Sequence, residues 1–495
     1  MATSTKTSEV QALTSEELER GLNVARTQRV AVFVVAYNAE AHIRQTLRRI
    51  PAELMEALTS IYVIDDSSVD ETTSLARSLG DEIPILEVFQ TPHNQGYGGN
   101  QKLGYQYASR RGFDVVVLLH GDGQYAPEFL PRILAPFDDP ETAAVFGSRM
   151  MVPGAARRGG MPLYKYVGNR ILTIAENHLL EANLSEFHSG YRAYRVSALE
   201  QVPFQYNTND FHFDTEIIIQ LLGREMKIVE VPIPTYYGDE ICHVEGIPYA
   251  AHCISTVLRS KANRYHLVYH PKFDVFGGDE YVFKEAPNTV HQHVLNRGWP
   301  DEGRVLELGA GHGEVGRRLH RGGLDVVAVE LEKPEREFPF PYLAANLDEP
   351  FAEDVVDAME GEADVVVALD VIEHLSRPER SLSEIRQAMK PGGTLVASTG
   401  NVAYVLVRLM LALGQFNYGT KGILDLTHTR LFTVRSFCRT LEGEGFRVES
   451  VRGFGPPIQD MVGRSGVLRM IDGVAGFLAR VWPSLFAYQI LVEAT

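Results

Sequence analysis

The 495-residue sequence predicts two α/β domains in one chain. Apolar runs of four to six residues alternate with helical patterns twice, once from Val30 to about Leu199 and again from Arg304 to about Ser398. This alternation is typical of parallel sheets with crossover helices. The length also exceeds what one hydrophobic core usually organises, since domains commonly run to roughly 100–200 residues.

The segment between the two patterns is punctuated and has no sustained period. Residues 265–300 contain a His-Pro pair, a Gly-Gly pair and two further prolines, as connectors between domains often do. We therefore expect a tail and short helix over residues 1–28, a first domain over 29–264, a linker over 265–300 and a second domain over 301–495.

Composition sets limits on the class of protein. The chain is 45% hydrophobic and 22% charged, so it has enough apolar residues for two cores. A formal charge of -17 argues against a nucleic-acid partner. The cysteines are scattered and form no CxxC pair, which suggests neither a disulfide framework nor a thiolate zinc site: Cys242, Cys253 and Cys438.

Two segments bear on localisation. Met1 to Arg29 is rich in Ser, Thr and Glu and has no apolar segment of the signal-peptide kind. Val402 to Leu413 is apolar but contains Arg408 and is shorter than the roughly 20 residues that span a bilayer. We interpret it as a buried core helix, with a membrane-surface helix or a pocket cover as the alternatives. The expected location is the cytoplasm, or the inner face of the membrane as a peripheral protein.

Polar clusters follow three strands of the first half. The runs Val30–Val35, Ile61–Ile64 and Val115–Leu119 end in AYNAE, DDSSVD and HGDGQY. Open α/β sheets bind ligands at the carboxyl ends of their strands, and carboxylate and amide oxygens spaced by two suit a hard divalent cation on a diphosphate. Helix capping by Asp and Ser is the structural alternative for each cluster, but three clusters on successive strands favour a site.

These motifs give the first half a family resemblance. From Val30 to about Arg264 the chain resembles the inverting family 2 glycosyltransferases with the GT-A fold, in the branch that includes dolichyl-phosphate mannose synthase. The matching pieces are AYNAE (36–40), VIDDSSVD (63–70), NQGYGGN (94–100), HGDGQY (120–125), GSR (147–149), HSGYRAYR (188–195) and FHFDTEI (211–217).

The resemblance implies a nucleotide-diphosphate-sugar donor and a reaction with inversion at the anomeric carbon. A divalent cation, Mn²⁺ or Mg²⁺, would hold the diphosphate, and Arg192 or Arg195 would stabilise the leaving group. Base and ribose would lie near Tyr37, Asn38, Glu40, Asp65 and Asp66, beside the loop that begins at Asn94; the cation would be held by His120, Asp122 and Gln124.

The metal motif departs from the family pattern. Where the family usually has Asp-x-Asp, this chain has His120-x-Asp122, which removes one negative charge and favours Mn²⁺ over Mg²⁺ or a loss of metal dependence. A carboxylate that deprotonates an acceptor hydroxyl is expected among Asp210, Asp214 and Glu216. Asp214 is the preferred base; the alternative is that these carboxylates orient the arginines of HSGYRAYR.

The second half contains a glycine-rich loop after its first strand. Arg304–Leu308 is followed by Gly309, Gly311 and Gly313, and a later strand ends in Glu330. Such glycines let the backbone approach a ligand at a helix N-terminus. The loop also fits a dinucleotide pattern, but Gly309 stands directly at the strand end and no second nucleotide half follows.

The order of motifs in this half resembles class I methyltransferases of the small-molecule type, over about Arg304 to Ala494. The resemblance implies S-adenosylmethionine as cofactor, held by Glu307, Gly309, Gly311, Gly313, Glu330, Asp348 and Asp370. An oxidoreductase is the alternative. Glu307 would suit the cationic amino-acid end of the donor.

Two polar groups could serve the methyl acceptor. His374 is the candidate general base, with helix packing as the alternative, and Arg430 in THTR (427–430) would meet a phosphate or carboxylate or pair with an acid of the fold. The sequence thus predicts a bifunctional enzyme of cell-envelope glycan or glycolipid synthesis, acting on a glycan or lipid-linked acceptor. The alternatives are a polyprenyl-phosphate glycosyltransferase with an attached methyltransferase, and a methyltransferase with an inactive sugar-binding module.

Overall fold

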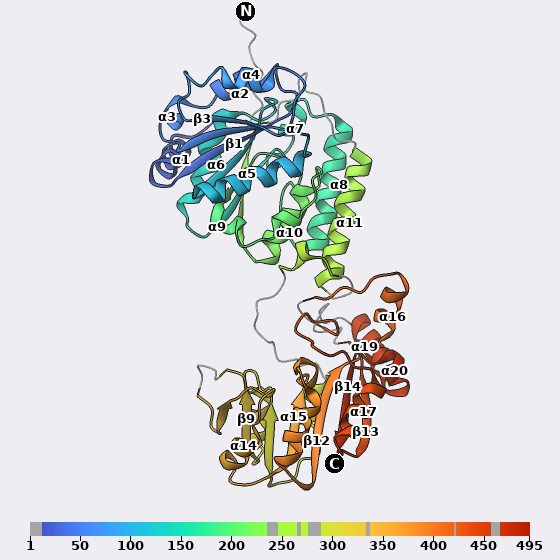
Figure 1. Cartoon of the computed structure of the whole chain (residues 1–495). Coiled ribbons are helices and arrows are strands. Elements are labelled where there is room, and N and C mark those ends of the chain that lie inside the picture. The colour runs from blue at the N-terminus through green and yellow to red at the C-terminus, as the bar shows by residue number, and fades with distance from the viewer. Residues whose placement is uncertain are drawn as a thin grey trace, which may run out of the picture. The chain divides into compact units, whose positions relative to one another are not determined.

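The protein is described by a computed structural model over residues 12–234, 246–264, 269–275, 289–332, 337–419, 422–456 and 466–495. The chain divides into two compact units, and the division falls between Arg264 and Gly278. Each unit contains one sheet with helices packed around it (Figure 1), and each is described by itself.

The first unit is built on a seven-stranded sheet in the order β3-β2-β1-β4-β6-β5-β7. All neighbours are parallel except β6, which runs antiparallel to β4 and β5. The strands are β1 Val30–Ala36, β2 Ser60–Asp65, β3 Leu86–Gln90, β4 Val115–His120, β5 Thr142–Ser148, β6 Arg192–Arg195 and β7 Lys227–Pro232.

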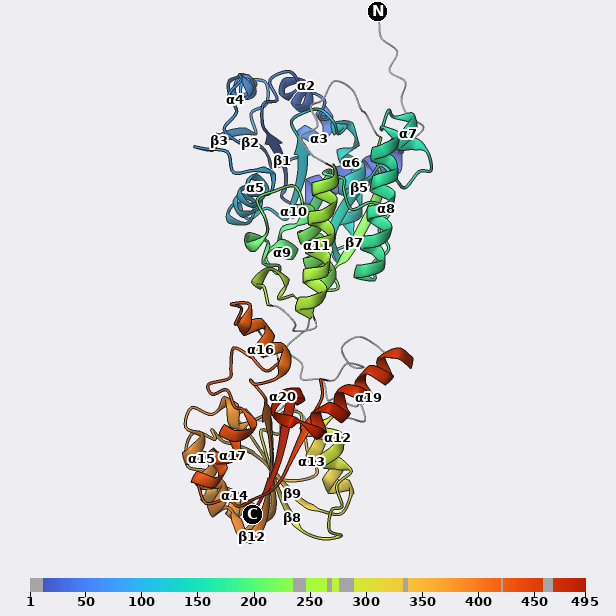
Figure 2. The same cartoon turned by 90° about the vertical axis from the view of Figure 1, so that its right-hand side faces the viewer.

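Helices cover both faces of this sheet, and for that reason every residue of β1, β2 and β5 is buried. Helices α8 and α11 pack side by side (Figures 1 and 2). The α-helices are α1 Ser15–Thr27, α2 Ile43–Arg48, α3 Ala52–Met55, α4 Thr72–Arg77, α5 Tyr97–Arg111, α6 Leu130–Leu134, α7 Ala155–Arg158, α8 Leu163–Leu180, α9 Val196–Leu199, α10 Phe213–Gly223 and α11 Gly246–Arg264, and the 3₁₀ turns are η1 Pro127–Phe129, η2 Ala135–Asp138, η3 Phe204–Tyr206 and η4 Pro271–Phe273.

The expected short N-terminal helix is present as α1. The Thr14 hydroxyl accepts a hydrogen bond from the Glu17 amide (3.1 Å), and the Glu17 carboxylate accepts one from the Thr14 amide (2.8 Å). This capping box satisfies two backbone donors that the first turn would leave unpaired. Leu22 and Val24 anchor the helix in the core of the unit.

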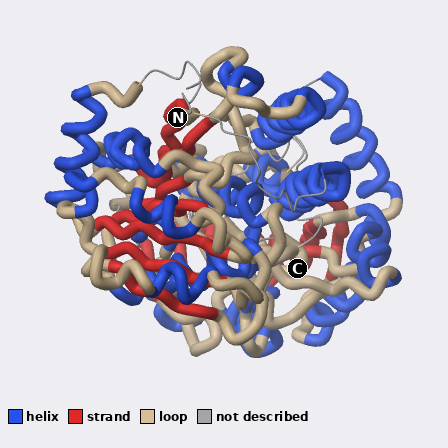
Figure 3. The backbone as a smooth tube through the Cα atoms, turned by 90° about the horizontal axis from the view of Figure 1, so that it is seen from above, coloured by secondary structure: helices blue, strands red, loops and turns tan. Residues whose placement is uncertain are grey.

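The second unit has a seven-stranded sheet in the order β10-β9-β8-β11-β12-β14-β13, in which β14 is antiparallel to both of its neighbours. Helices alternate with strands along the chain of this unit. Figure 3 distinguishes the helices (blue) from the strands (red). The elements are α12 Val290–Leu295, β8 Arg304–Leu308, α13 Glu314–Arg321, β9 Asp325–Glu330, β10 Tyr342–Ala344, α14 Ala352–Ala358, β11 Ala363–Leu369, η5 Ile372–His374, α15 Pro378–Gln387, β12 Met389–Gly400, α16 Val405–Ala412, α17 Val434–Gly443, β13 Val448–Phe454, α19 Gly466–Val481, α20 Pro483–Phe486 and β14 Gln489–Ala494.

The structure corrects two expectations. The sheets are mixed, because β6 runs antiparallel to β4 and β5 in the first unit and β14 runs antiparallel to β12 and β13 in the second. The interpretation of Val402 to Leu413 as a core helix is wrong. Only Val407 of α16 is buried, and Leu409, Leu411 and Leu413 are exposed.

Part of the segment predicted as a linker is folded. Within residues 265–300, Phe273 is buried against Ile219 and Val257 of the first unit, and Val290 and Val294 are buried in the core of the second. Residues 265–268 and 276–288 of this segment lie outside the described ranges.

If the antiparallel strands β6 and β14 are set aside, the strand order of each sheet reverses once, between β1 and β4 in the first unit and between β8 and β11 in the second. Chain connections diverge to opposite faces there, which opens a crevice at the carboxyl ends of the strands. The predicted motifs AYNAE and HGDGQY flank the first reversal, and the glycine loop and Asp370 flank the second.

Candidate active sites

The loops that follow β1 and β2 are joined by reciprocal hydrogen bonds. The Asn38 amide donates to the Ser68 hydroxyl (2.8 Å), and the Asn38 side chain accepts from the Val69 amide (3.1 Å). Asn38 (φ 48°) and Ser67 (φ 64°) adopt the left-handed region that non-glycine residues seldom occupy. Strained backbone of this kind is often found in functional loops. The ring of Tyr37, next to Asn38, is exposed.

Glu40 takes part in the same contact between the loops that follow β1 and β2. Its carboxylate accepts from the Glu71 amide (3.1 Å), and its own amide donates to the Asp70 carboxylate (3.1 Å). The Glu40 side chain remains exposed at the loop surface. Its two hydrogen bonds fix the shape of the loop that carries Tyr37.

The two aspartates after β2 face different surroundings. Asp65 is fully buried and accepts hydrogen bonds from the Ser68 and Thr73 hydroxyls. Asp66 accepts from the Gln95 amide (2.8 Å), and its carbonyl accepts from the Asn94 side chain (3.3 Å). Burial raises the pKa of Asp66 above its ordinary value. Asp65 therefore braces its own loop, whereas Asp66 fastens the glycine-rich loop that begins at Asn94.

The predicted metal motif begins at the last residue of β4. The Nε2 atom of His120 lies 3.3 Å from the Tyr97 hydroxyl, and an added Cβ on Gly190 would come within 2.5 Å of the same nitrogen. Nδ1 is therefore the ring nitrogen left for a cation. Burial lowers the pKa of His120, which keeps the imidazole neutral and able to ligate.

Asp122 and Gln124 form a tight turn after β4. One Asp122 oxygen accepts from the Gln124 amide (2.9 Å), and Gly123 between them has φ +76°. The bond fixes the carboxylate beside the strand end. An imidazole nitrogen, a carboxylate oxygen and an amide oxygen form a donor set that fits Mn²⁺.

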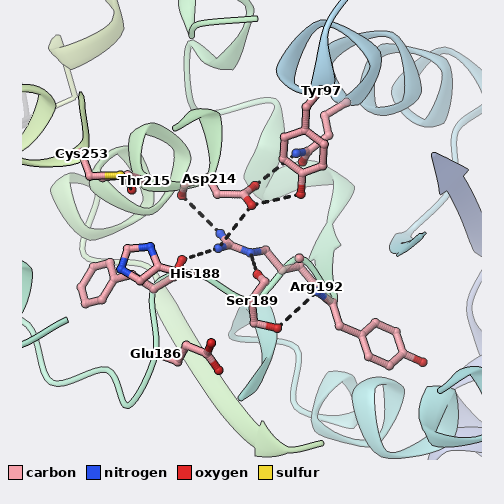
Figure 4. A network of polar contacts seen from close by, with 12 residues as sticks. Tyr97, Glu186, His188, Ser189, Arg192, Asp214, Thr215 and Cys253 are labelled. Carbon is pink, nitrogen blue, oxygen red and sulfur yellow. Dashed lines mark hydrogen bonds and ion pairs between the residues drawn. The ribbon is translucent and has the colours of Figure 1, made fainter. Parts of the chain in front are cut away.

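A chain of polar contacts extends from His120 into the core. The Tyr97 hydroxyl, which contacts His120, donates to one Asp214 oxygen (3.1 Å), and Gln101 donates to the other (3.1 Å). The Arg192 guanidinium lies 3.7 Å from the first of these oxygens. Figure 4 shows the Asp214 carboxylate directed at both Tyr97 and Arg192. The structure thus joins four of the predicted motifs.

The two arginines of HSGYRAYR lie in different places. Arg192 is buried and donates to the main-chain oxygens of Ser189, Phe187 and Asp214. Arg195 pairs with Val115, at the opposite end of β4 from His120. The alternative role for Asp214, orienting an arginine, is consistent with these contacts, and Arg195 is not at the site.

Glu216 and Asp210 do not join this chain. The Glu216 carboxylate is buried on another face of α10, where it forms an ion pair with Lys272 (2.5 Å). Asp210 is exposed beside His212 and His252. The three carboxylates are close in the sequence, but Asp214 and Glu216 point to different sides of α10 and Asp210 precedes this helix.

Tyr97 and Gln101 are the residues that the sequence reasoning missed. Both lie in the first turns of α5, where Gln101 is buried and Tyr97 is partly buried, and both contact Asp214. The motif NQGYGGN indicated a loop for backbone approach, but nothing in its spacing indicated that the tyrosine hydroxyl would bridge two other motifs.

In the second unit the glycine loop joins β8 to α13. Gly309, Gly311 and Gly313 all have positive φ (65°, 53° and 65°). Added Cβ atoms on Gly309 and Gly313 would collide with Val371 and Phe338, whereas one on Gly311 would meet nothing within 4 Å. Gly311 therefore faces the open space in which a ligand can lie against the backbone.

Two acidic side chains support this loop. Glu330 accepts from the Gly311 amide (2.8 Å), and Glu307 accepts from the Gly316 amide in α13 (2.9 Å). Burial raises the pKa of Glu307 to about 8. A cation beside Glu307 would offset that desolvation, which suits the ammonium end of an amino-acid ligand.

Asp348 and Asp370 follow two other strands of the same sheet, β10 and β11. One Asp348 oxygen accepts from the Ser376 amide (2.9 Å) and caps the approach to α15. Asp370 follows β11 with φ 56°, and its carboxylate accepts from Ser398 (2.8 Å) and Gln489. Asp370 thus occupies a strained position at the strand end nearest the point of reversal.

His374 is exposed and oriented by a second polar residue. Its Nδ1 lies 3.0 Å from the Thr427 hydroxyl, which donates to Asp425 (2.7 Å). The ring of His428 packs edge-on against the ring of His374, with 4.6 Å between the ring centroids. Arg430 pairs with Glu379, which is the alternative that the sequence left open for this arginine.

Comparisons with known proteins agree with both units. Residues 31–202 match the family model for glycosyl transferase family 2, and residues 279–451 match a methyltransferase domain model. These matches define the class of protein: the chain is an enzyme with a glycosyltransferase unit and a methyltransferase unit.

Similar proteins identify the family. A polyprenol monophosphomannose synthase of Mycolicibacterium smegmatis is 30% identical over 214 residues, which cover 42% of this chain and 78% of that protein. An undecaprenyl-phosphate mannosyltransferase of Micrococcus luteus is 29% identical over 206 residues, 41% of this chain and 82% of that protein. The chain belongs to glycosyl transferase family 2, and the predicted classes of both domains are confirmed.

Solved structures resemble each unit at low identity. A glucosyl-3-phosphoglycerate synthase of Mycobacterium tuberculosis in complex with UDP is 18% identical with a TM-score of 0.39, over 49% of this chain and 83% of that one. A SAM dependent methyltransferase of Archaeoglobus fulgidus is 21% identical with a TM-score of 0.28, over 39% and 85%.

Proposed function

We propose that the first unit transfers a sugar from a nucleotide-diphosphate donor, with inversion, to a lipid-linked phosphate, and that the second unit transfers a methyl group from S-adenosylmethionine. The proposal for the first unit rests on the series of contacts His120–Tyr97–Asp214–Arg192. These contacts bring four motifs together near the point where the strand order reverses. The second half rests on Gly311, the loop glycine with open space before it.

The contacts of Asp214 favour an anionic acceptor. Both of its oxygens accept hydrogen bonds, from Tyr97 and Gln101, and Arg192 lies beside it. A buried carboxylate whose two oxygens are already engaged in this way is poorly placed to reach and take the proton of an acceptor hydroxyl. Glu216 is likewise paired with Lys272. A phosphate acceptor is already a nucleophile at neutral pH, so it needs no base, whereas a hydroxyl acceptor would need one.

His120 through Nδ1, Asp122 and Gln124 would hold a divalent cation, which would neutralise charge on the diphosphate. The rigid turn at Gly123 keeps Asp122 in position, and Asp66 keeps the Asn94 loop closed onto the nucleotide side of the crevice. Displacement at the anomeric carbon then forms the new bond to the acceptor oxygen while the nucleoside diphosphate leaves.

The exposed face of helix α8 supports the proposal that the acceptor lies at a lipid surface. Its exposed side is apolar, with Tyr164 (74% exposed), Ile171 (64%) and Ile174 (63%) at helical spacing. Across residues 151–180 the only acidic residue is the buried Glu176, while the basic ones are Arg157, Arg158, Lys165 and Arg170. An apolar face flanked by cations binds anionic interfaces. No helix within the described ranges is long and apolar enough to span a membrane.

In the second unit the geometry supports O-methylation. Thr427 holds His374 at Nδ1, and Asp425 in turn accepts from Thr427. This leaves Nε2 to take the proton of an acceptor hydroxyl as its oxygen accepts the methyl group. S-adenosylmethionine supplies that methyl group when it is bound against Gly311.

The second unit also has an apolar helix face. Met470, Val474, Phe477 and Val481 are exposed at helical spacing along α19, and the exposed Trp482 follows directly. A lipid-linked saccharide would explain why both units carry such a face. We therefore propose that the two transfers act on lipid-linked intermediates of cell-envelope glycan synthesis.

The test uses the full chain with a panel of labelled nucleotide-diphosphate sugars and Mn²⁺. The acceptors are polyprenyl phosphate in vesicles and a free glycan hydroxyl. We expect transfer to the lipid phosphate. Transfer to the hydroxyl alone would overturn the acceptor assignment, and an absence of both transfer and donor hydrolysis would favour the inactive sugar-binding module.

A vesicle flotation assay tests the role of α8. Ile171→Glu with Ile174→Glu should abolish flotation with vesicles that contain anionic lipid, whereas Tyr206→Glu, an exposed residue outside α8, should leave it unchanged. Equal flotation of the two variants would exclude α8 as the contact.

A further inference from the structure

A buried cluster in the first unit combines three kinds of metal ligand. Glu176 of α8, His188 of the loop before β6 and Cys253 of α11 have potential ligand atoms within 4.8 Å of one another. Glu176 and Cys253 are fully buried, and the His188 side chain is 8% exposed. None of the three belongs to the predicted donor or acceptor sites.

Several polar atoms of these three side chains already have hydrogen-bond partners. The Thr215 hydroxyl lies 3.3 Å from Glu176 Oε1 and 3.4 Å from Cys253 Sγ and can donate its one proton to either of them, and His188 Nδ1 lies 3.0 Å from the Tyr249 hydroxyl. Figure 4 shows Thr215 beside Cys253, and His188 on the same side of Arg192 as these two residues. Partners of this kind fix the orientation of ligands around a bound metal.

The two atoms that would bind a cation, Glu176 Oε2 and His188 Nε2, have no hydrogen-bond partner among the described residues. Glu176 Oε2 and His188 Nε2 are both buried, and they face one another at 3.0 Å without the alignment of a hydrogen bond. Burying such atoms without a full partner costs free energy. A cation between them and Cys253 would remove that cost.

The donor set and its charge favour zinc. Nitrogen, sulfur and carboxylate oxygen are the ligands of Zn²⁺, whereas Mg²⁺ and Ca²⁺ take oxygen. A carboxylate and a thiolate would balance the two charges of the ion, which suits a buried site. Tetrahedral zinc requires ligand atoms about 3.3–3.6 Å apart, so the observed spacing needs only small side-chain shifts.

We propose that Glu176, His188 and Cys253 bind a structural Zn²⁺ ion that ties α8 and α11 to the loop before β6. That loop also supplies Gly190, which packs against His120. The ion would thus hold the wall of the sugar-transfer site while taking no part in the reaction. Because Tyr249 contacts Nδ1 on the other side of the His188 ring, the fourth ligand position is left to water.

The test measures zinc in the full chain, purified without a metal-affinity step. We expect one equivalent by elemental mass spectrometry, and its loss in Cys253→Ser. Cys438→Ser is the thiol control, because it lies in the second unit. His252→Ala controls for the exposed group Asp210, His212 and His252, whose ligand atoms also lie within 4.8 Å. Both controls should keep the zinc.

A second measurement does not depend on how well the variants fold. Wild-type protein reloaded with Co²⁺ should show thiolate-to-cobalt charge-transfer absorption in the near ultraviolet, and Cys438→Ser, which keeps Cys253, should retain this absorption. The proposal is overturned if the wild-type chain takes up no equivalent of zinc, if Cys253→Ser retains it, or if His252→Ala loses it.

Discussion

Replacing Glu307 by Gln should stabilise the second unit in a way that depends on pH. The Glu307 side chain is buried, and burial raises its pKa from 4.5 to about 8. A carboxyl whose pKa is raised by folding contributes stability below pH 4.5 that is lost as the pH rises towards 8. Gln does not titrate, and its side-chain oxygen can still accept from the Gly316 amide.

The magnitude follows from the shift. Each pKa unit corresponds to about 1.4 kcal/mol, so wild-type protein loses roughly 1.5 kcal/mol by pH 5.5 and roughly 4 kcal/mol by pH 8. The difference in unfolding free energy between Glu307→Gln and wild type should therefore widen by about 3 kcal/mol across this window. Other titrating groups cancel because they are common to both proteins.

The assay is denaturant unfolding followed by tryptophan fluorescence. Both tryptophans of the chain, Trp299 and Trp482, lie in the second unit, so the signal is specific to it. Glu314→Gln is the control, because Glu314 is partly exposed in ion pairs on α13 and should change stability by less than about 1 kcal/mol at every pH.

The same pair of proteins tests the link to the methyl donor. A bound ammonium group beside Glu307 favours its charged form, so S-adenosylmethionine should raise the stability of wild-type protein at pH 8 more than that of Glu307→Gln. A stability difference that stays constant from pH 5.5 to 8 would refute the reasoning on Glu307.

Three further substitutions test the two sites separately. Asp122→Ala should reduce sugar transfer by at least about a hundredfold and leave methyl transfer intact; loss of both would mean that the units are not independent. Gly190→Ala would bring a Cβ within 2.5 Å of His120, so we expect at least a tenfold loss of sugar transfer with unchanged methyl transfer, and full activity would contradict the described packing. Gly311→Asn keeps a residue type that tolerates positive φ but fills the open space, so calorimetry should show at least tenfold weaker binding of S-adenosylmethionine; unchanged affinity would exclude our assignment of the loop.

Local patterns were sufficient for much of the fold. The strands at Val30, Ile61 and Arg304 were predicted to within one or two residues, because apolar periodicity and the turn that ends a strand lie within a few residues of one another. A short helix was also predicted within residues 1–28, without bounds, and α1 spans Ser15–Thr27. The short strand β3 at Leu86 was not identified, since its sequence has no clear alternation.

The site was predictable as a set of motifs but not as a set of contacts. Asn38, Asp66 and Asp122 were expected near a ligand because they follow strands, and they do lie at the carboxyl ends of β1, β2 and β4. That Asp214 turns towards Tyr97 while Glu216 turns towards Lys272 depends on the rotation of α10 against its neighbours. Spacing in the sequence does not carry this information.

By itself, the sequence determined the two α/β units, the family and the strand ends at which each site forms, because these depend on local periodicity and contiguous motifs. Tertiary structure alone decided which side chains meet. Glu176, His188 and Cys253 lie within 4.8 Å of one another although up to 77 residues separate them, and α16 turns its leucines outward despite an apolar sequence. Contacts and exposure of this kind depend on how elements distant in the sequence pack together.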